Sequence, residues 1–190
     1  MTINPLGSSS MLSRRSSLRA LALMPISTAA FTVANREERR ELSTLLCRSA
    51  EGRALSRVRY RNAESFYTAI RDGRVGRARE AYYQTGIVAQ LALSAHLLDV
   101  GFNDIWCASH IGLDVAKSLE CANATGLDFT SHDFQRMAAF LSPYGRWRNP
   151  DLTSANQQRY PFTIEQMAGL TRDLLDHVQR VTGHRAPSCK

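Results

Sequence analysis

The sequence predicts an all-α protein, a bundle of four or five helices that follows a cleavable or disordered N-terminal segment. Apolar residues recur every three or four positions in several segments, and Gly or Pro separates these segments. No segment alternates apolar and polar residues as a strand does, and no internal repeat is visible. The 190 residues therefore divide into an N-terminal segment (1–34), a helical domain (35–183) and a polar tail (184–190).

The N-terminal segment opens with a basic motif and continues with an uncharged run. Five residues of the motif are Ser13, Arg14, Arg15, Leu18 and Arg19. They resemble the twin-arginine (Tat-type) export signal, whose consensus is Ser-Arg-Arg, any residue, Phe, Leu, Lys, although Ser17 stands where Phe is preferred. Residues 20–35 carry no charge, and residues 32–34 offer small side chains at a cleavage point. The resemblance implies recognition by the protein export machinery and a periplasmic or secreted protein.

Two other interpretations of this segment stay open. Residues 1–35 hold three Arg, seven Ser and no acidic residue, as a mitochondrial presequence does, and a basic N-terminus of a cytoplasmic protein has a similar composition. The uncharged run of sixteen residues is shorter than the roughly 20 that cross a bilayer, so a permanent membrane span is not favoured.

The charge of the chain argues only weakly for nucleic-acid binding. The formal net charge of +7 includes the three N-terminal arginines, so the chain from Asn35 onward carries 21 basic and 17 acidic residues, or +4. Nucleic acid is therefore an allowed partner but not the favoured one.

The first predicted helix begins at Asn35, an N-cap residue, and continues into an arginine-rich stretch. Residues 48–79 contain nine Arg, and Arg53, Arg57 and Arg61 recur every fourth position, which places them on one helix face. Tyr60, Phe66 and Tyr67 lie near them in sequence. This face is a candidate binding surface for an unknown protein or another acidic partner, and a merely solvated face is the alternative.

Two more helices are predicted at residues 74–99 and 104–125, the second beginning after the N-cap Asn103 and ending at Gly126. Helical spacing predicts a core-facing side for the first, formed by Tyr83, Ile87, Leu91, Ala95 and Leu98. It predicts one for the second, formed by Ile105, Ala108, Ile111, Val115, Leu119 and Ala122.

A short helix is predicted to begin at Thr130 or Ser131 and to end at Pro143, and a long one begins at the capping box of Thr163 and Gln166 and ends at Gly183. Their predicted buried residues are Phe134, Met137, Ala138 and Leu141 in the first, and Met167, Leu170, Leu174, Val178 and Val181 in the second. Residues 144–161, which lie between them, predict a long exposed loop with Trp147 as a second candidate contact.

No motif predicts a catalytic residue or a cofactor. A metal site is one hypothesis, because a straight helix over residues 104–125 would gather Cys107, His110, Asp114 and Cys121 within an arc of about 60°. His96 and Asp99 on the preceding helix would have to complete the ligand set. Cys107 and Cys121 would lie about 21 Å apart on that helix and could not form a disulfide, whereas pairing of Cys47 with either stays open and Cys189 is expected to be free.

A helix-turn-helix is a competing interpretation of the same region. The first half of this motif resembles a run in this chain that contains Ala108, Ile111, Gly112, Leu113 and Asp114. The second half fits badly, because Ser118 and Cys121 stand where aliphatic core residues are usual and Lys117 faces two acidic neighbours. This interpretation requires a break at Gly112 and so excludes the straight-helix metal site.

Three functions follow in order of preference. The first is a small exported helical-bundle protein with a binding or structural role and no catalysis of its own. The second is a cytosolic nucleic-acid-binding regulator that uses the arginine-rich face or the turn at residues 108–114. The third is a metal-dependent enzyme built around His96, Asp99, Cys107 and His110.

Overall fold

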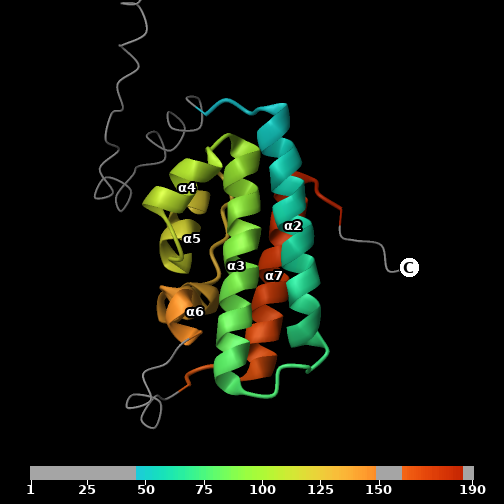
Figure 1. Cartoon of the computed structure of the whole chain (residues 1–190), viewed down its shortest axis with the longest axis vertical. Coiled ribbons are helices and arrows are strands. Elements are labelled where there is room, and N and C mark those ends of the chain that lie inside the picture. The colour runs from blue at the N-terminus through green and yellow to red at the C-terminus, as the bar shows by residue number, and fades with distance from the viewer. Residues whose placement is uncertain (1–45, 149–159, 186–190) are drawn as a thin grey trace, which may run out of the picture.

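The computed structural model describes residues 46–148 and 160–185 and confirms the all-α prediction. Six α-helices and one 3-10 helix form the described part, and that part contains no strand (Figure 1). The helices are α2 (Ala50–Arg71), α3 (Ala78–Val100), α4 (Asp104–His110), α5 (Val115–Ala124), α6 (His132–Leu141), η2 (Tyr144–Trp147) and α7 (Ile164–Thr182). No helix in these residues is both long enough and apolar enough to span a bilayer.

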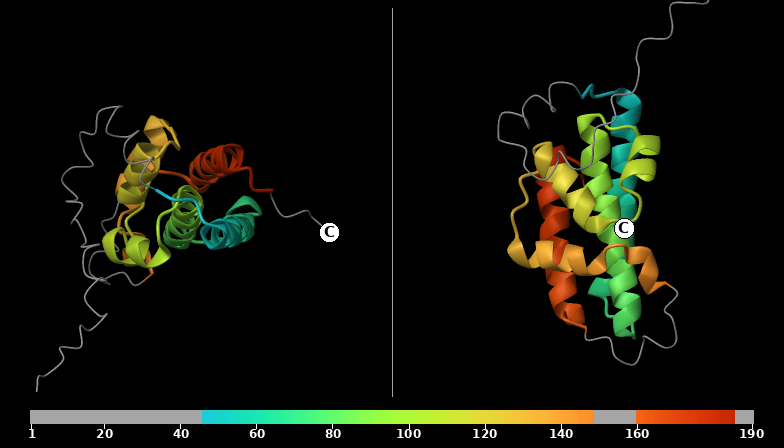
Figure 2. Two further views of the ribbon diagram at one scale, coloured as in Figure 1. Left: turned by 90° about the horizontal axis from the view of Figure 1, so that it is seen from above. Right: turned by 90° about the vertical axis from the view of Figure 1, so that its left-hand side faces the viewer.

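Helix α3 is the centre of the fold. The long helices α2 and α7 run beside it, and the short helices α4, α5 and α6 pack on its other side (Figures 1 and 2). Because it has neighbours on several sides, 14 of its 23 residues are buried. Four of its five alanines have no exposed surface and let the neighbouring helices approach closely: Ala81, Ala89, Ala92 and Ala95.

The predicted core-facing side of α3 is only partly correct. Ala95 and Leu98 are buried, but Tyr83, Ile87 and Leu91 are half-buried and face away from the most buried side of the helix. A helix that is surrounded by others is apolar nearly all round, so spacing alone cannot select one buried face.

The predicted helix at residues 104–125 is wrong, because the structure divides it into α4 and α5. Gly112 adopts a left-handed conformation with φ of 62°, which a helix interior does not contain. Asp114 then caps α5 by accepting a hydrogen bond of 2.9 Å from the backbone nitrogen of Lys117. Cys107 and Cys121 therefore lie on different helices, and both are buried thiols without a disulfide.

Other helix ends follow the predicted caps. Asn103 caps α4, Ser131 caps α6, and Thr163 forms the capping box of α7 with Gln166. Helix α2 begins at Ala50 after the N-cap Ser49, so the predicted helix does not run continuously through residues 46–49. The predicted start at residue 35 lies outside the described residues, as does the whole export motif.

The C-terminal end of the fold extends one residue beyond the predicted boundary. His184, predicted as the first residue of a polar tail, is buried, and its Nε2 lies 2.6 Å from Oγ of Ser56. The hydroxyl group of Ser56 donates its one proton to the carbonyl oxygen of Ala95. In the contact with His184, Oγ of Ser56 must therefore accept, and Nε2 of His184 donates. Burial lowers the pKa of His184, which keeps the ring neutral at pH 7. This chain of hydrogen bonds joins the segment that follows α7 to α2 and α3.

Candidate functional site

The residues proposed as metal ligands are not brought together. No three His, Cys, Asp or Glu side chains gather into a metal-binding group within residues 46–148 and 160–185. His96 is buried beside Thr125, and burial lowers its pKa to about 4. Asp99 is also buried, and its nearest cations are the guanidinium groups of Arg48 at 3.6 Å and Arg53 at 3.9 Å. These two residues belong to the packing of α3 against its neighbours.

The remaining proposed ligands have separate contacts. His110 is exposed and stacks on the ring of Trp106 at a centroid distance of 4.6 Å. Asp114 is occupied as the cap of α5, and Cys107 is buried beside a groove that is described below. The straight helix on which the metal hypothesis depended does not exist.

The turn between α4 and α5 breaks at Gly112, as the helix-turn-helix resemblance requires. Ser118 and Cys121 are nevertheless buried, and Glu120 is the one residue of α5 that is well exposed. The ammonium group of Lys117 donates to the carbonyl oxygen of His110. A helix whose exposed residue is acidic offers DNA little attraction, so the turn does not favour nucleic-acid binding.

Trp147 is not an exposed contact, and that prediction is wrong. Its side chain is 3% exposed and stacks on Tyr82 at a centroid distance of 4.9 Å. Its ring nitrogen donates to the carbonyl oxygen of Leu141, and Arg79 donates to its backbone oxygen over 2.8 Å. The polar residues around Trp147 in the sequence predicted an exposed loop, whereas the structure places Trp147 at the end of η2, where it closes the core. The rest of the predicted loop, residues 149–159, lies outside the described residues.

The arginine surface, defined as Arg53, Arg57 and Arg61, lies on one exposed face of α2 as predicted. Arg53 approaches Asp99 at 3.9 Å, whereas Arg57 and Arg61 make no ion pair or hydrogen bond with the described residues. The predicted aromatic neighbours are elsewhere. Tyr60 and Tyr67 are buried in the core, and Phe66 turns toward the groove.

The surroundings of the arginine surface are partly apolar and partly cationic. Ala54 and Val58 lie next to it on α2, and Val58 is 49% exposed. The charges of all three arginines lower the pKa of His184 after the larger effect of burial, while the charge of Asp99 raises it. The C-terminal end of the fold therefore borders the arginine surface, which sequence spacing could not indicate.

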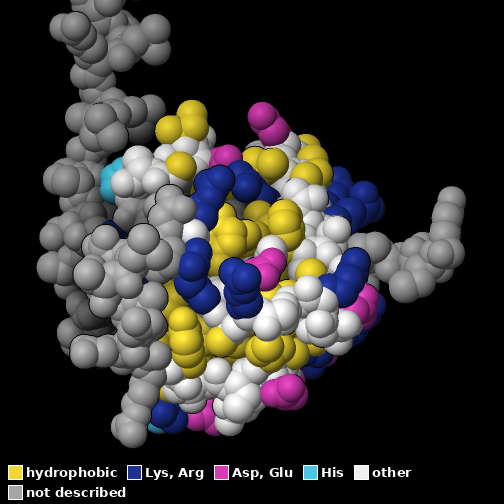
Figure 3. Space-filling view, turned by 60° about the horizontal axis from the view of Figure 1, so that its bottom comes forward, with side chains coloured by type: hydrophobic (Ala, Val, Ile, Leu, Met, Phe, Trp, Pro, Cys, Tyr) yellow, Lys and Arg dark blue, Asp and Glu magenta, His cyan; other side chains and the backbone are white. Residues whose placement is uncertain are grey.

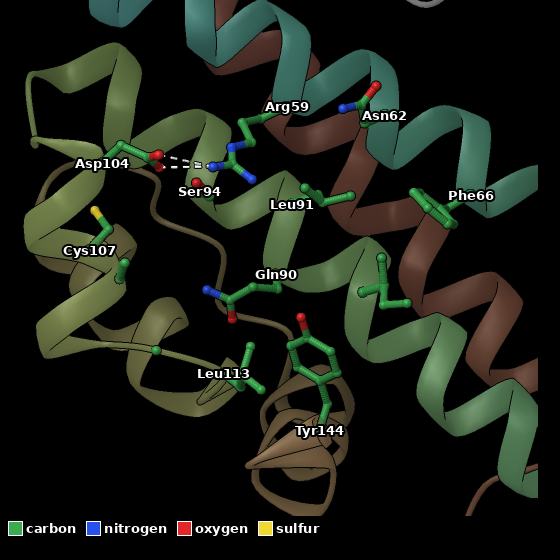
Figure 4. Close-up of a pocket in the computed structure, with 13 residues that line it drawn as sticks. Arg59, Asn62, Phe66, Gln90, Leu91, Ser94, Asp104, Cys107, Leu113 and Tyr144 are labelled. Atoms are coloured by element: carbon green, nitrogen blue, oxygen red, sulfur yellow. Dashed lines mark hydrogen bonds and ion pairs between the residues drawn. The ribbon is translucent and has the colours of Figure 1, made fainter. Parts of the chain in front are cut away.

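A groove on the other side of α2 is a second candidate site. It has a volume of about 480 Å³ and lies between α2, α3, α4, the turn that precedes α5 and η2 (Figure 4). At its upper end Nη2 of Arg59 donates to both carboxylate oxygens of Asp104, each over 3.0 Å. Figure 3 shows a different feature, an apolar patch bordered by several basic side chains on the face where the lower ends of the long helices come forward.

No model of a protein family, no curated protein and no solved structure matches this chain, so its two candidate sites are judged by their own geometry.

Proposed function

We propose that this protein is a small helical binding module whose arginine surface receives an acidic, amphipathic helical segment of a partner protein. The observation that carries the proposal is that Arg57 and Arg61 have no anionic partner in the described part of the chain. Several other arginines are used within the fold: Arg59 binds Asp104, Arg172 binds Glu64, and Arg79 binds backbone oxygens. Two unpaired cations on one helix face leave their charge available to a ligand.

The spacing on α2 fits a helical partner. Side chains four residues apart lie about 6 Å apart along the helix axis, so carboxylates four residues apart on a second, parallel helix would meet successive guanidinium groups. The apolar surface of Ala54 and Val58 beside the arginines offers a contact for apolar side chains of the same segment.

Two features favour a protein over a nucleic acid. Val58 would gain from burial against an apolar side chain, whereas a phosphate backbone offers it none. The described residues contain 16 Lys and Arg against 13 Asp and Glu, a modest excess compared with the strongly basic surfaces of nucleic-acid-binding domains.

Charge reversal of the arginine surface tests the proposal. The ligand is a 20-residue helical peptide with Glu at every fourth position and Leu beside it, and binding is measured by fluorescence anisotropy at low salt. We expect Arg57→Glu with Arg61→Glu to weaken binding at least about tenfold, because two attractions become repulsions. A peptide in which every Glu is replaced by Gln should bind the unmodified protein as weakly as the original peptide binds the double variant.

The matched control is Arg77→Glu with Arg148→Glu, which reverses two exposed arginines outside α2 and should leave peptide binding unchanged. Equal losses in the two double variants, or no binding at all, would contradict the proposal. Retention of a 20-base-pair duplex that is lost only in Arg57→Glu with Arg61→Glu, without peptide binding, would support the nucleic-acid alternative instead.

We also propose that the module is exported by the twin-arginine route, on the strength of the motif at residues 13–19. N-terminal sequencing of protein from fractionated cells should find a chain that begins near Asn35 outside the cytoplasm. Arg14→Lys with Arg15→Lys should keep the full-length chain inside. A full-length chain in the cytoplasm of cells that carry the unmodified gene would refute export and leave the arginine surface to be tested separately.

A further inference from the structure

We propose that the groove between α2, α3, the α4–α5 turn and η2 is a binding site for a small neutral molecule with an apolar body and a hydrogen-bond-accepting carbonyl oxygen. The proposal is independent of the arginine surface, because Arg53, Arg57 and Arg61 do not line the groove.

The size and walls of the groove suit a small ligand. Its volume of about 480 Å³ falls within the roughly 300–1,000 Å³ of small-molecule sites. Ile87 and Leu91 belong to α3 on one side, and Phe66 and Leu113 stand on other elements around the same space. Phe66 is 43% exposed and Leu113 is 49% exposed, so an apolar ligand would remove a substantial apolar area from water.

The charges of the groove are balanced. Among the described residues that line the groove, Arg59 is the one cation and Asp104 the one anion, and Nη2 of Arg59 binds both carboxylate oxygens, so the two charges neutralise each other (Figure 4). Burial raises the pKa of Cys107 to about 12 and also raises the pKa of Tyr144, so both groups are uncharged at pH 7. An ionic ligand would lose its hydration without gaining a counter-ion, which favours a neutral one.

Among the described residues, the lining side chains of Gln90 and Tyr144 each keep a donor without a partner. Asn62 and Ser94 also line the groove, and their side chains carry oxygens that can accept as well as groups that donate. The amide oxygen of Gln90 accepts from Ser118, which leaves the amide nitrogen of Gln90 for another acceptor. The hydroxyl of Tyr144 points into the same space in Figure 4. A carbonyl oxygen on the ligand is the group that would satisfy such donors without adding charge.

The groove is held open by the backbone around it. The backbone nitrogen of Tyr144 donates to the carbonyl oxygen of Leu113 over 3.2 Å, which ties η2 to the α4–α5 turn. Gly86 of α3 lies directly against the side chain of Tyr144, where a larger residue would collide with it. Because the site is preformed, little binding free energy is lost in ordering its residues when the ligand binds.

Prodan, a neutral naphthyl ketone whose emission reports the polarity of its surroundings, is a suitable first ligand. We expect saturable, one-to-one binding of prodan to the full-length protein with a blue shift of its emission. Two competitors share one aromatic core and differ in charge: 2-acetylnaphthalene is neutral and 2-naphthoate is anionic. The neutral ketone should displace prodan at a concentration at least about tenfold lower than the carboxylate.

Two tryptophan substitutions locate the ligand. Ala108 is exposed and lines the groove, so Ala108→Trp should fill it and weaken prodan binding at least about tenfold. Ala139 is also exposed, on α6, but does not line the groove, and Ala139→Trp should leave prodan binding unchanged. Circular dichroism checks that both variants retain their helices.

Each alternative result overturns the inference. Absence of saturable prodan binding, or equal displacement by the ketone and the carboxylate, would show that the groove does not select a neutral carbonyl compound. Binding that survives Ala108→Trp would place the ligand elsewhere. Arg57→Glu with Arg61→Glu should not alter prodan binding, so failure here and failure of the arginine surface are separate outcomes.

Discussion

Replacing Glu64 by Ala is expected to lower the free energy of unfolding by about 2–3 kcal/mol, because it leaves the buried hydroxyl of Tyr60 and the partly buried guanidinium group of Arg172 without a shared acceptor. The Glu64 side chain is 9% exposed, and Arg172 of α7 binds its two oxygens over 2.8 and 2.9 Å. Tyr60 donates to the same carboxylate over 2.6 Å. Removal of the carboxylate therefore affects a guanidinium group and a phenol at once, between two helices that are distant in sequence.

Urea denaturation followed by circular dichroism measures the loss, and Asp176→Ala is the matched control. Asp176 binds the same Arg172 over 2.7 Å, but its side chain is 49% exposed. Exposed ion pairs contribute at most about 1 kcal/mol, so this variant should be close to the unmodified protein. Similar stabilities for Glu64→Ala and Asp176→Ala would show that burial does not distinguish the two pairs.

The same pair makes stability depend on pH. Burial alone would raise the pKa of Glu64, but hydrogen bonds from Arg172 and Tyr60 outweigh it and hold the pKa below its usual value of 4.5. The stabilisation is therefore complete above pH 4.5 and is lost as the pH falls through the lower pKa of the folded state. Glu64→Gln cannot titrate, so its stability should fall less steeply than that of the unmodified protein between about pH 5 and 3.

Local signals predicted helix ends well because a cap is made by neighbours in sequence. The capping box of Thr163 and Gln166 and the left-handed Gly183 appear in the structure as expected. Gly112 and Asp114 are also a helix-end signal and a helix-start signal, but the apolar residues of 104–125 keep helical spacing through both positions and so predicted one continuous helix. At that point local chemistry prevailed over periodicity: a left-handed glycine followed by a capping aspartate ends one helix and begins another.

The candidate sites could be predicted only where spacing along one helix defines them. The arginine surface is such a case, since residues four apart share a helix face in any protein. Spacing could not tell that Arg59 is paired while Arg57 has no partner among residues 46–148 and 160–185, because the partner of Arg59 is Asp104, 45 residues further along the chain. The groove takes residues from several separate elements, so it depends on how α4 and η2 fold back onto α3, which no local pattern encodes.

Trp147→Ala is the second substitution with a large expected effect, about 3–5 kcal/mol of destabilisation. An exposed loop residue would cost roughly 0.5 kcal/mol or less, so this variant separates the observed structure from the loop that composition predicts. The indole is buried against Tyr82 and Phe140, with the guanidinium group of Arg146 over its ring at 5.0 Å. Its removal leaves a cavity and ends a ring stack that joins η2 to α3.

The other tryptophan, Trp106, provides the control that distinguishes a buried Trp147 from an exposed one. Trp106 is half-buried and stacks on the exposed ring of His110, so Trp106→Ala should destabilise the fold less than Trp147→Ala does. Trp106→Phe leaves Trp147 as the sole indole, and its emission should be blue-shifted and protected from acrylamide. Emission at the wavelength of a solvated indole, together with a small loss of stability in Trp147→Ala, would mean that Trp147 faces water and that η2 does not close the core. We expect blue-shifted emission and a large loss of stability instead, because a buried and stacked indole stabilises the fold through its whole contact area.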